Sequence, residues 1–369
     1  MRSVGREKAL GGGADGAVVA MLVGVVATIA GTCLALRADR TRAIDPPVRS
    51  PTGDPGEALP SAKREQQALS PLIAGATHPL GETPVADRDA ALDGGVTGPG
   101  ISVVVATRDR PAALESCLLA LSRQSVALEI VVVDDGSADA RAVAGAVRLG
   151  APDARVVTGA GRGPAAARNL GARAARGAIV CFTDDDCLPD RRWAERLAAA
   201  CAERCAAAGT TVADPAAGRA AAASQVITHT LQIASLNRAA GLLGFAPTCN
   251  LACHAEILRA VPFDESFPLA AGEDRDWCAR VAGAGVGLRF VPEAIVAHGP
   301  PIGTLGLLRQ QARYGRGAVR FRAVAGQRRL SGRAFYRRLA RAAAREGPAV
   351  TALVLLAQAA GAAGAACEV

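Results

Sequence analysis

The chain has 369 residues, half of them apolar, which is enough for a sizeable core in one large domain or two modest ones. Only 3% of the residues are aromatic, so we expect a core built mainly from Ala, Val and Leu, and the net charge of +8 comes almost wholly from Arg. Ten cysteines without a C-x-x-C pair argue against a disulfide framework or a structural zinc site. We expect reduced thiols, packed as small apolar side chains in a reducing compartment.

Two uncharged runs have the composition of membrane-spanning helices. After a short tail (1–16), residues 17–36 form an apolar run of 20, about enough to cross a bilayer, with a signal peptide as the alternative. Residues 347–367 form a weaker run, for which an Ala-rich helix on or inside the protein is the alternative. Many arginines between 320 and 345 precede this second run, and only Glu368 follows it. The positive-inside rule therefore predicts a cell-membrane protein whose middle part is cytoplasmic.

The part between the two runs divides into a linker, a central domain and a basic tail. Residues 37–98 are rich in Pro, Gly and Asp without sustained periodicity, which predicts a flexible linker. In the domain at 99–300, apolar runs predict strands at 101–106, 129–135, 154–157 and 178–182, and helical patterns lie after Pro111, at 163–176 and at about 190–207. This alternation predicts an α/β fold with a mostly parallel, Rossmann-like sheet covered by helices on both faces.

Polar side chains follow three of the predicted strands, at the sheet edge where ligands of such folds bind. Thr107 follows the first strand, Asp134–Ser137 the second, and the triplet Asp184–Asp186 the fourth. Consecutive carboxylates repel one another, and a divalent cation is the usual way to make that arrangement favourable. Oxygen ligands select a hard ion such as Mg²⁺ or Mn²⁺, while solvated turn residues are the alternative. Cys187, beside the triplet, is expected to be a wall residue rather than a soft ligand.

Six ordered blocks in about residues 99–300 resemble glycosyltransferase family 2, a group of inverting enzymes with the GT-A nucleotide-sugar fold. The blocks are ISVVVATRDRP, EIVVVDDGSAD, GPAAARNLGARAARG, IVCFTDDDCLPDRRWAERL, TCNLACHAEILRAVPFDESF and GEDRDWCARVAGAG. Each block is weakly specific, but their common order is strong support for the resemblance. The turn Thr107-Arg108-Asp109 departs from the family, which often has an aromatic residue followed by Asn there. UDP, GDP and dTDP donors therefore all remain open.

The resemblance implies a set of roles for the polar residues. It assigns nucleotide-sugar binding to Thr107, Asp135 (base), Arg168 (diphosphate), Asp184 and Asp185, and a Mn²⁺ or Mg²⁺ site to Asp184, Asp186 and His298. The division of labour within the triplet stays open, since Asp184 or Asp185 can bind the ribose instead. For Arg168 the alternative is a solvated helix arginine, and for His298 a loop histidine.

The resemblance also places the catalytic base. The family's acidic pair matches Glu273 and Asp274, and Asp274 corresponds to the base that takes the acceptor's proton. The alternative is a helix N-terminus that uses its carboxylates as dipole partners. Trp277 is a candidate for stacking on an acceptor sugar, with core packing as the alternative. The family's processive members carry a Q-x-x-R-W motif after the base, and its absence here predicts single sugar additions.

The basic segment at 301–346 mixes apolar residues and arginines at helical spacing. We expect amphipathic helices that lie on anionic lipid and present the site to a glycan or lipid-linked acceptor. No recognition module accompanies the arginines, so nucleic acid is not an expected partner. A nucleotidyltransferase and a non-catalytic nucleotide-sugar-binding protein are the competing functions for the same fold.

Overall fold

The computed structural model describes residues 100–368 except 268, 270, 300–301 and 326–331. The predicted tail, apolar run and linker at 1–16, 17–36 and 37–98 lie outside the described residues.

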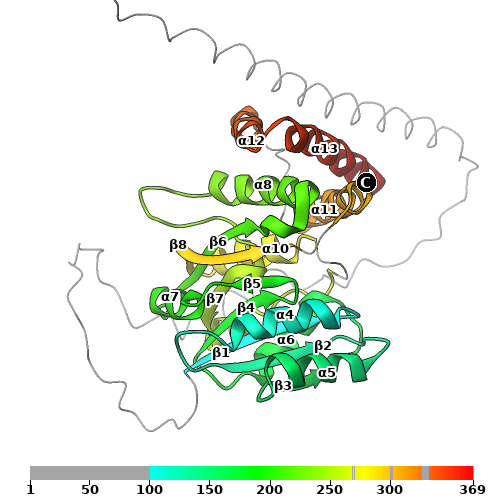
Figure 1. Cartoon of the computed structure of the whole chain (residues 1–369). Helices are drawn as coiled ribbons and strands as arrows, with labels where there is room; N and C mark the ends of the chain where they lie inside the picture. The colour runs from blue at the N-terminus through cyan, green and yellow to red at the C-terminus, as the bar shows by residue number, and fades with distance from the viewer. Residues whose placement is uncertain (1–99, 268, 270, 300–301, 326–331, 369) are drawn as a thin grey trace, which may run out of the picture.

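A mixed eight-stranded sheet forms the centre of the described part, in the order β3-β2-β1-β4-β7-β6-β8-β5 (Figure 1). Its strands are β1 (Ile101–Thr107), β2 (Glu129–Asp134), β3 (Arg155–Thr158), β4 (Ile179–Asp184), β5 (Cys187–Pro189), β6 (Cys205–Ala213), β7 (Leu251–His254) and β8 (Gly287–His298). The first four strands are parallel, as predicted. The expected mostly parallel sheet holds only in part for the other half: β6 and β8 are parallel, but β7 runs antiparallel to β4 and β6, and β5 to β8.

Helices cover both faces of the parallel strands, because successive side chains of each strand point to opposite sides. Val103 and Val105 of β1 pack with α4 (Pro111–Leu121), α5 (Ala140–Gly150) and α7 (Trp193–Ala200). Val104 packs with α6 (Pro164–Ala174), α9 (Ala255–Ala260) and α10 (Glu273–Gly283) on the other face. Helix α6 lies so close to β1 that a Cβ on Gly171 would be 2.3 Å from Val104 Cγ1. This close approach positions Arg168, one turn earlier, near the strand ends.

The predicted helix at 190–207 is wrong in its second half, because α7 ends at Ala200 and β6 begins at Cys205. Residues 206–208 are three alanines, which favour a helix by intrinsic propensity. In the structure they are fully buried in the sheet, and Gly209 follows so closely packed that a Cβ there would lie 1.9 Å from the Ala294 carbonyl oxygen. Small residues allow this close strand packing, and the tertiary contacts outweigh the local helix propensity.

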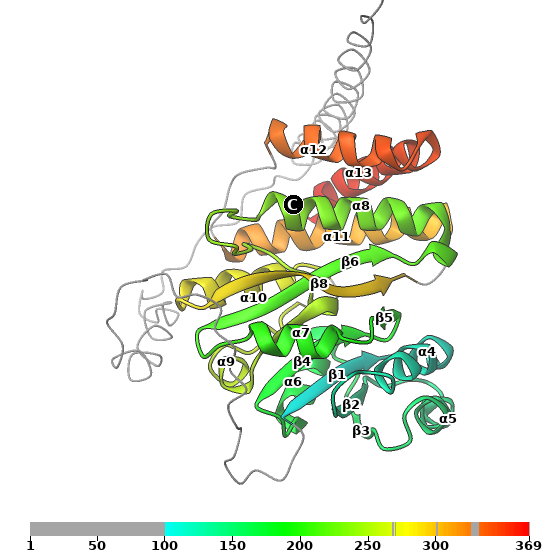
Figure 2. The same cartoon turned by 60° about the vertical axis from the view of Figure 1, so that its left-hand side comes forward.

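Four helices form a separate layer beside β6 and β8 (Figures 1 and 2). They are α8 (Gly218–Ala234), α11 (Thr304–Val324), α12 (Arg333–Arg345) and α13 (Pro348–Glu368). Their shared apolar core includes Ala223, Leu307, Leu339 and Val354, one residue from each helix. In the sequence, α8 precedes the acidic pair of α10, and the other three helices follow it. The layer packs these distant segments together.

Helix α13 is the one helix in the described part that is long and apolar enough to cross a membrane, with a mean hydropathy of 1.8. In the structure it packs against α11, α8 and α12, and 22% of its most apolar window is buried. Glycines bring α11 and α13 into backbone contact: a Cβ on Gly315 would lie 1.9 Å from the Gly361 carbonyl oxygen, and one on Gly364 equally close to that of Ala312.

We expect Gly364→Ala to loosen α13, because the added methyl collides with backbone that cannot move without separating the helices. Overpacking of this kind costs about 1–3 kcal/mol. The melting temperature should fall, and amide exchange should accelerate in α13. Gly283→Ala in α10 is the matched control, since a Cβ there meets no atom within 4 Å. Equal melting temperatures for the two variants would contradict the observed packing.

Candidate active site

The acidic triplet lies at the carboxyl end of β4, where it meets the end of β1. Thr107, the last residue of β1, donates a hydrogen bond from Oγ1 to Asp185 Oδ2 at 2.7 Å. Asp185 is completely buried, and its burial raises the pKa of this carboxyl to about 7. Thr107 and the triplet, which follow different strands in the sequence, therefore lie together at the sheet edge as predicted. Asp185 lies beneath the site, while Asp184 and Asp186 line its cavities.

Arg110, which no sequence motif indicated, forms ion pairs with two members of the triplet. Arg110 places Nη2 at 2.6 Å from Asp185 Oδ1 and Nη1 at 2.6 Å from Asp186 Oδ2. The preceding Asp109 has a φ of 56°, the only positive φ of a non-glycine residue in the described part. Its carboxylate accepts a hydrogen bond from Ala138 N at 2.7 Å, which holds this strained turn. The position of Arg110 directly after a strand-end turn was the signal available in the sequence.

Arg168 joins the triplet to the acidic pair of α10. Its Nη2 lies 3.0 Å from Asp184 Oδ1 and its Nη1 lies 2.9 Å from Glu273 Oε1, although Glu273 is 105 residues away along the chain. Burial lowers the pKa of this guanidinium, but the two carboxylates outweigh burial and raise it. Both terminal nitrogens are thus engaged by carboxylates, and binding of the diphosphate by Arg168 stays a prediction.

Asp135 uses its carboxylate to hold the loop before α6. Its Oδ1 accepts hydrogen bonds from Gly161 N at 2.9 Å and Arg162 N at 3.2 Å, and its Oδ2 accepts one from Gly163 N at 2.8 Å. These bonds fix the entry to the helix that carries Arg168. Contact between Asp135 and a nucleotide base stays a prediction.

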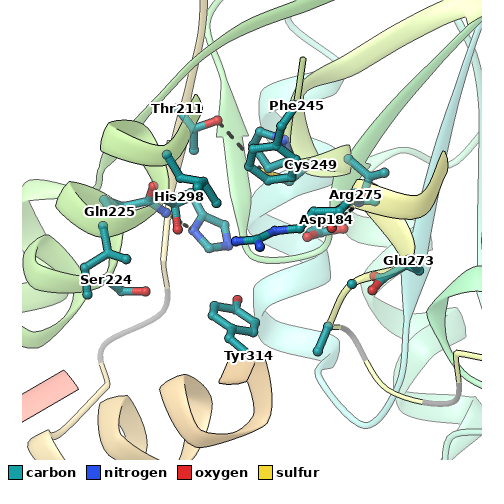
Figure 3. Close-up of a pocket in the computed structure, with 18 of the residues that line it drawn as sticks. Asp184, Thr211, Ser224, Gln225, Phe245, Cys249, Glu273, Arg275, His298 and Tyr314 are labelled. Atoms are coloured by element: carbon teal, nitrogen blue, oxygen red, sulfur yellow. Dashed lines mark hydrogen bonds between the residues drawn. The ribbon is translucent and has the colours of Figure 1, made fainter. Parts of the chain in front are cut away.

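Asp274 lies in the first turn of α10 and lines the same cavity as Asp184 and His298. Burial, and then the neighbouring charge of Glu273, raise the pKa of Asp274 to about 7. Figure 3 shows that Tyr314 points from α11 into this cavity, opposite His298 and Asp184. The structure therefore brings Asp184 of the triplet, the predicted base and the predicted histidine to one cavity.

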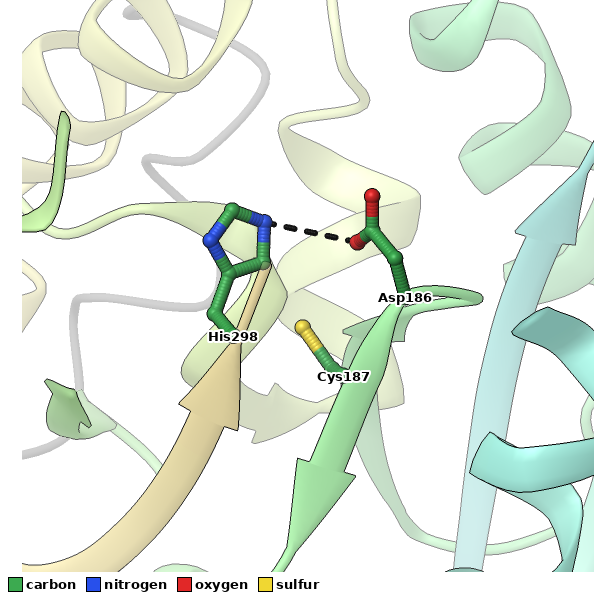
Figure 4. A group of neighbouring side chains, drawn as sticks. All are labelled: Asp186, Cys187 and His298. Atoms are coloured by element: carbon green, nitrogen blue, oxygen red, sulfur yellow. Dashed lines mark ion pairs between the residues drawn. The ribbon is translucent and has the colours of Figure 1, made fainter. Parts of the chain in front are cut away.

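His298 ends β8 directly opposite Cys187 of the antiparallel strand β5. Its Nε2 is 3.3 Å from Asp186 Oδ1, in ion-pair range, and its Nδ1 contacts the side-chain amide of Gln225 on α8. Burial lowers the pKa of His298, but Asp186 outweighs burial and raises it to about 9. Ligand atoms of Asp186, Cys187 and His298 all lie within 4.8 Å of one another (Figure 4).

These three side chains fit a divalent cation, because an oxygen, a nitrogen and a sulfur ligand converge at one point. The buried Asp186 Oδ1 makes no hydrogen bond, so it is available to a cation. Asp184 is not one of the three, since Arg168 holds its carboxylate at 3.0 Å. The predicted set of Asp184, Asp186 and His298 thus has two members that converge and one that lies beside them.

Helix α11 faces the site rather than only the surface. A second cavity beside the triplet is lined by Arg110, Arg309, Gln310, Arg313 and Tyr314, together with Asp186 and His298. The segment 310–314 reads Q-Q-A-R-Y, which matches Q-x-x-R-W except that Tyr314 replaces the Trp. The expectation of single additions therefore depends on this one aromatic residue. A motif that accepts Tyr as well as Trp at its last position includes this segment.

Trp277 belongs to the core and not to an acceptor site. It is fully buried, donates a hydrogen bond from Nε1 to the Val261 carbonyl oxygen at 2.9 Å, and stacks on Phe263 with ring centroids 5.3 Å apart. The suggested sugar stacking by Trp277 is therefore wrong. Phe245 and Tyr314 are the aromatic residues that line the cavity.

Comparisons with known proteins identify a family and several similar proteins. Residues 102–261 match the family model for glycosyl transferase family 2. The pre-mycofactocin glycosyltransferase of Mycobacterium tuberculosis (strain ATCC 25618 / H37Rv) is 30% identical over 204 residues, which are 54% of this chain and 42% of that protein. Glycosyltransferase AglE of Haloferax volcanii is 29% identical over 242 residues, which are 60% of this chain and 74% of that protein.

The solved structure of the mannosyltransferase PcManGT from Pyrobaculum calidifontis aligns with a TM-score of 0.48 and 20% identity, over 93% of this chain and 85% of that one. The chain matches less than half of the length of the mycobacterial relative. The region that matches the family model begins in β1 and ends just after α9, and includes the acidic triplet and Arg168. The resemblance seen in the sequence is confirmed: residues 102–261 match glycosyl transferase family 2, and the chain is similar over about half of its length to two proteins named as glycosyltransferases.

Proposed function

We propose that the chain is an inverting glycosyltransferase that moves a sugar from a nucleotide-diphosphate donor to a hydroxyl of a glycan or lipid-linked acceptor. The observation that carries this proposal is the single cavity lined by Asp184, His298 and Asp274, which come from β4, β8 and α10. Displacement with inversion needs a base on one side of the sugar and stabilisation of the leaving group on the other. In this cavity Asp274 is the candidate base, and Asp184 and His298 lie where the leaving group would be stabilised.

Asp274 is the group that would take the proton of the acceptor hydroxyl as its oxygen attacks the anomeric carbon. The bond between that carbon and the donor phosphate breaks, and its electron pair stays with the nucleoside diphosphate. A pKa of about 7 leaves Asp274 able to accept a proton near neutral pH and strong enough as a base to do so. Glu273 is held by Arg168 and therefore positions the start of α10 rather than moving a proton.

The leaving diphosphate would lie at the other side, near Asp186 and His298. A divalent ion such as Mn²⁺ or Mg²⁺, when bound there with Asp184 beside it, would supply Lewis-acid stabilisation of the phosphate oxygens. Arg110, Arg309 and Arg313 line the adjoining cavity and provide further positive charge for an anionic donor. The excess of cationic groups on this side fits a nucleotide diphosphate.

The acceptor side has an apolar and aromatic wall. Leu231 of α8, Phe245 and Tyr314 line the cavity near Asp274. Aromatic and apolar walls with few polar groups suit a sugar ring or the first part of a lipid carrier. Because Tyr314 lies on α11, the helices that follow the family 2 domain contribute to the proposed acceptor site.

We expect Asp274→Asn to lower the transfer rate by at least about 100-fold, because the amide cannot accept the hydroxyl proton. The measurement is release of nucleoside diphosphate from a panel of UDP-, GDP- and dTDP-sugars by the purified full chain, with and without Mn²⁺. Asp276→Asn is the matched control, since Asp276 lies on the same helix but pairs with Arg280 at 2.7 Å. Near-wild-type transfer by Asp274→Asn would refute the base assignment, and an absence of nucleoside diphosphate binding would refute the donor class.

The pH dependence provides a second readout of the same residue. Asp274 must be deprotonated to act as a base, so wild-type kcat should rise with pH through about 7 and level off above it. The residual rate of Asp274→Asn should lack this rise. A wild-type profile that is flat between about pH 5.5 and 8 would count against the proposed role.

We also propose that the enzyme works at the cytoplasmic face of the cell membrane, where a lipid-linked acceptor is presented. Arg333, Arg337 and Arg345 of α12 are exposed, while Leu339 on the same helix is buried in the helical layer. Helix α13 adds an apolar surface on which Leu356 is 50% exposed. Exposed arginines next to apolar side chains suit the surface of an anionic bilayer.

Replacing Arg333, Arg337 and Arg345 by Gln should weaken binding of the full chain to anionic vesicles by about 100-fold, at about 1 kcal/mol for each arginine. Co-sedimentation with vesicles that contain phosphatidylglycerol measures this, and pure phosphatidylcholine vesicles serve as the uncharged reference. Equal binding of the variant and the wild type to anionic vesicles would show that α12 is not the lipid-facing element.

A further inference from the structure

Cys187 lies at the cation centre because of strand register. It pairs with His298 across β5 and β8, and side chains at directly opposite positions of antiparallel strands lie on the same face. Cys187 is completely buried, and Figure 4 shows its sulfur pointing toward the gap between the His298 ring and the Asp186 carboxylate. Its sulfur belongs to the group of three ligand atoms that lie within 4.8 Å of one another.

The two oxygens of Asp186 have different surroundings. Oδ2 is held by Arg110 at 2.6 Å, whereas Oδ1 is buried, makes no hydrogen bond and faces His298. The side chain as a whole is 10% exposed. The polar neighbour of Oδ1 is His298 Nε2 at 3.3 Å, and a cation bound between the two side chains would replace this ion pair. A cation at Oδ1 would leave the ion pair with Arg110 in place.

The surroundings of His298 also suit a metal ligand. Its Nδ1 contacts the side-chain amide of Gln225, and Gln225 Oε1 is buried without a hydrogen-bond partner. Exchanging the oxygen and nitrogen of that amide lets Nδ1–H donate to Oε1, which satisfies both atoms. Nε2 faces Asp186 and Cys187, and it would offer its lone pair to a metal once its proton has left. Metal-binding histidines usually have such an outer partner.

We propose that Asp186, Cys187 and His298 form a mixed oxygen–sulfur–nitrogen site for a borderline-soft divalent cation such as Zn²⁺ or Co²⁺, with the Cys187 thiolate as a direct ligand. The inference rests on the proposed function for the presence of a cation here, and goes beyond it in the sulfur ligand and in the class of ion. Thiolate, imidazole and carboxylate together suit Zn²⁺ and Co²⁺ better than Mg²⁺. The Nε2 proton of His298 and the thiol proton of Cys187 pass to solvent as the metal–nitrogen and metal–sulfur bonds form.

The test is a titration of the chelator-treated full chain with Co²⁺, which gives a near-ultraviolet charge-transfer band when a thiolate binds it. We expect this band in the wild type and its loss in Cys187→Ala. Affinity for Co²⁺ and Zn²⁺ should fall by at least about 10-fold, since even outer partners of a ligand contribute that much. Affinity for Mn²⁺, which favours oxygen ligands, should change by less than about 3-fold. Cys253→Ala, a buried thiol of β7 that is not part of the three-residue group, should keep the band.

Melting temperatures of the metal-free variants show whether each one folds. Cys249 is a second thiol that lines the first cavity together with His298. A band that persists in Cys187→Ala, or that disappears only in Cys249→Ala, would overturn the assignment of the sulfur ligand. Tight Co²⁺ binding by the wild type without the band would also overturn it, while leaving the cation of the proposed function in place. If the wild type binds no divalent cation, both the inference and the proposed cation fail, but the predictions for Asp274 do not.

Discussion

One buried arginine sets the distance between the two halves of the site. Arg168 is only 5% exposed and bridges Asp184 at the end of β4 and Glu273 at the start of α10. A buried guanidinium is tolerated only when it is paired, and the two carboxylates would repel each other without it. The bridge therefore stabilises all three groups together. Because Asp274 follows Glu273 directly, the position of the proposed base relative to the triplet depends on this ion pair.

The helical layer contributes residues to the site in addition to those of the sheet. The sheet edge supplies the triplet and His298, while α8 supplies Gln225 and α11 supplies Tyr314 and Arg313. Backbone contact through glycines fixes α11 against α13. The segment 301–346, expected to lie on lipid, thus has one helix that lines the site, α11, and one with exposed arginines, α12. This arrangement would couple docking at a bilayer to the shape of the acceptor cavity.

Local sequence patterns were sufficient for the parallel half of the sheet and for the strand-end triplet, whereas the acidic pair of α10 came from the family resemblance. They failed at 205–213, where an alanine run forms a strand because tertiary packing outweighs helix propensity. They also could not show that Arg168 meets Glu273 or that Cys187 faces His298, since both contacts join distant segments. The role of Arg110 was not predicted, because it depends on the strained turn at Asp109, and secondary-structure propensities do not predict such a turn.

The central claim is that a base on α10 and a leaving-group site at the end of β4 act from opposite sides of the donor sugar. The most direct measurement is the anomeric configuration of the first transfer product, followed by proton NMR before mutarotation or further reaction can change it. The account predicts inversion at the anomeric carbon relative to the donor. A product that retains the donor's configuration would contradict it, because Asp274 would then have no acceptor proton to take from the opposite face.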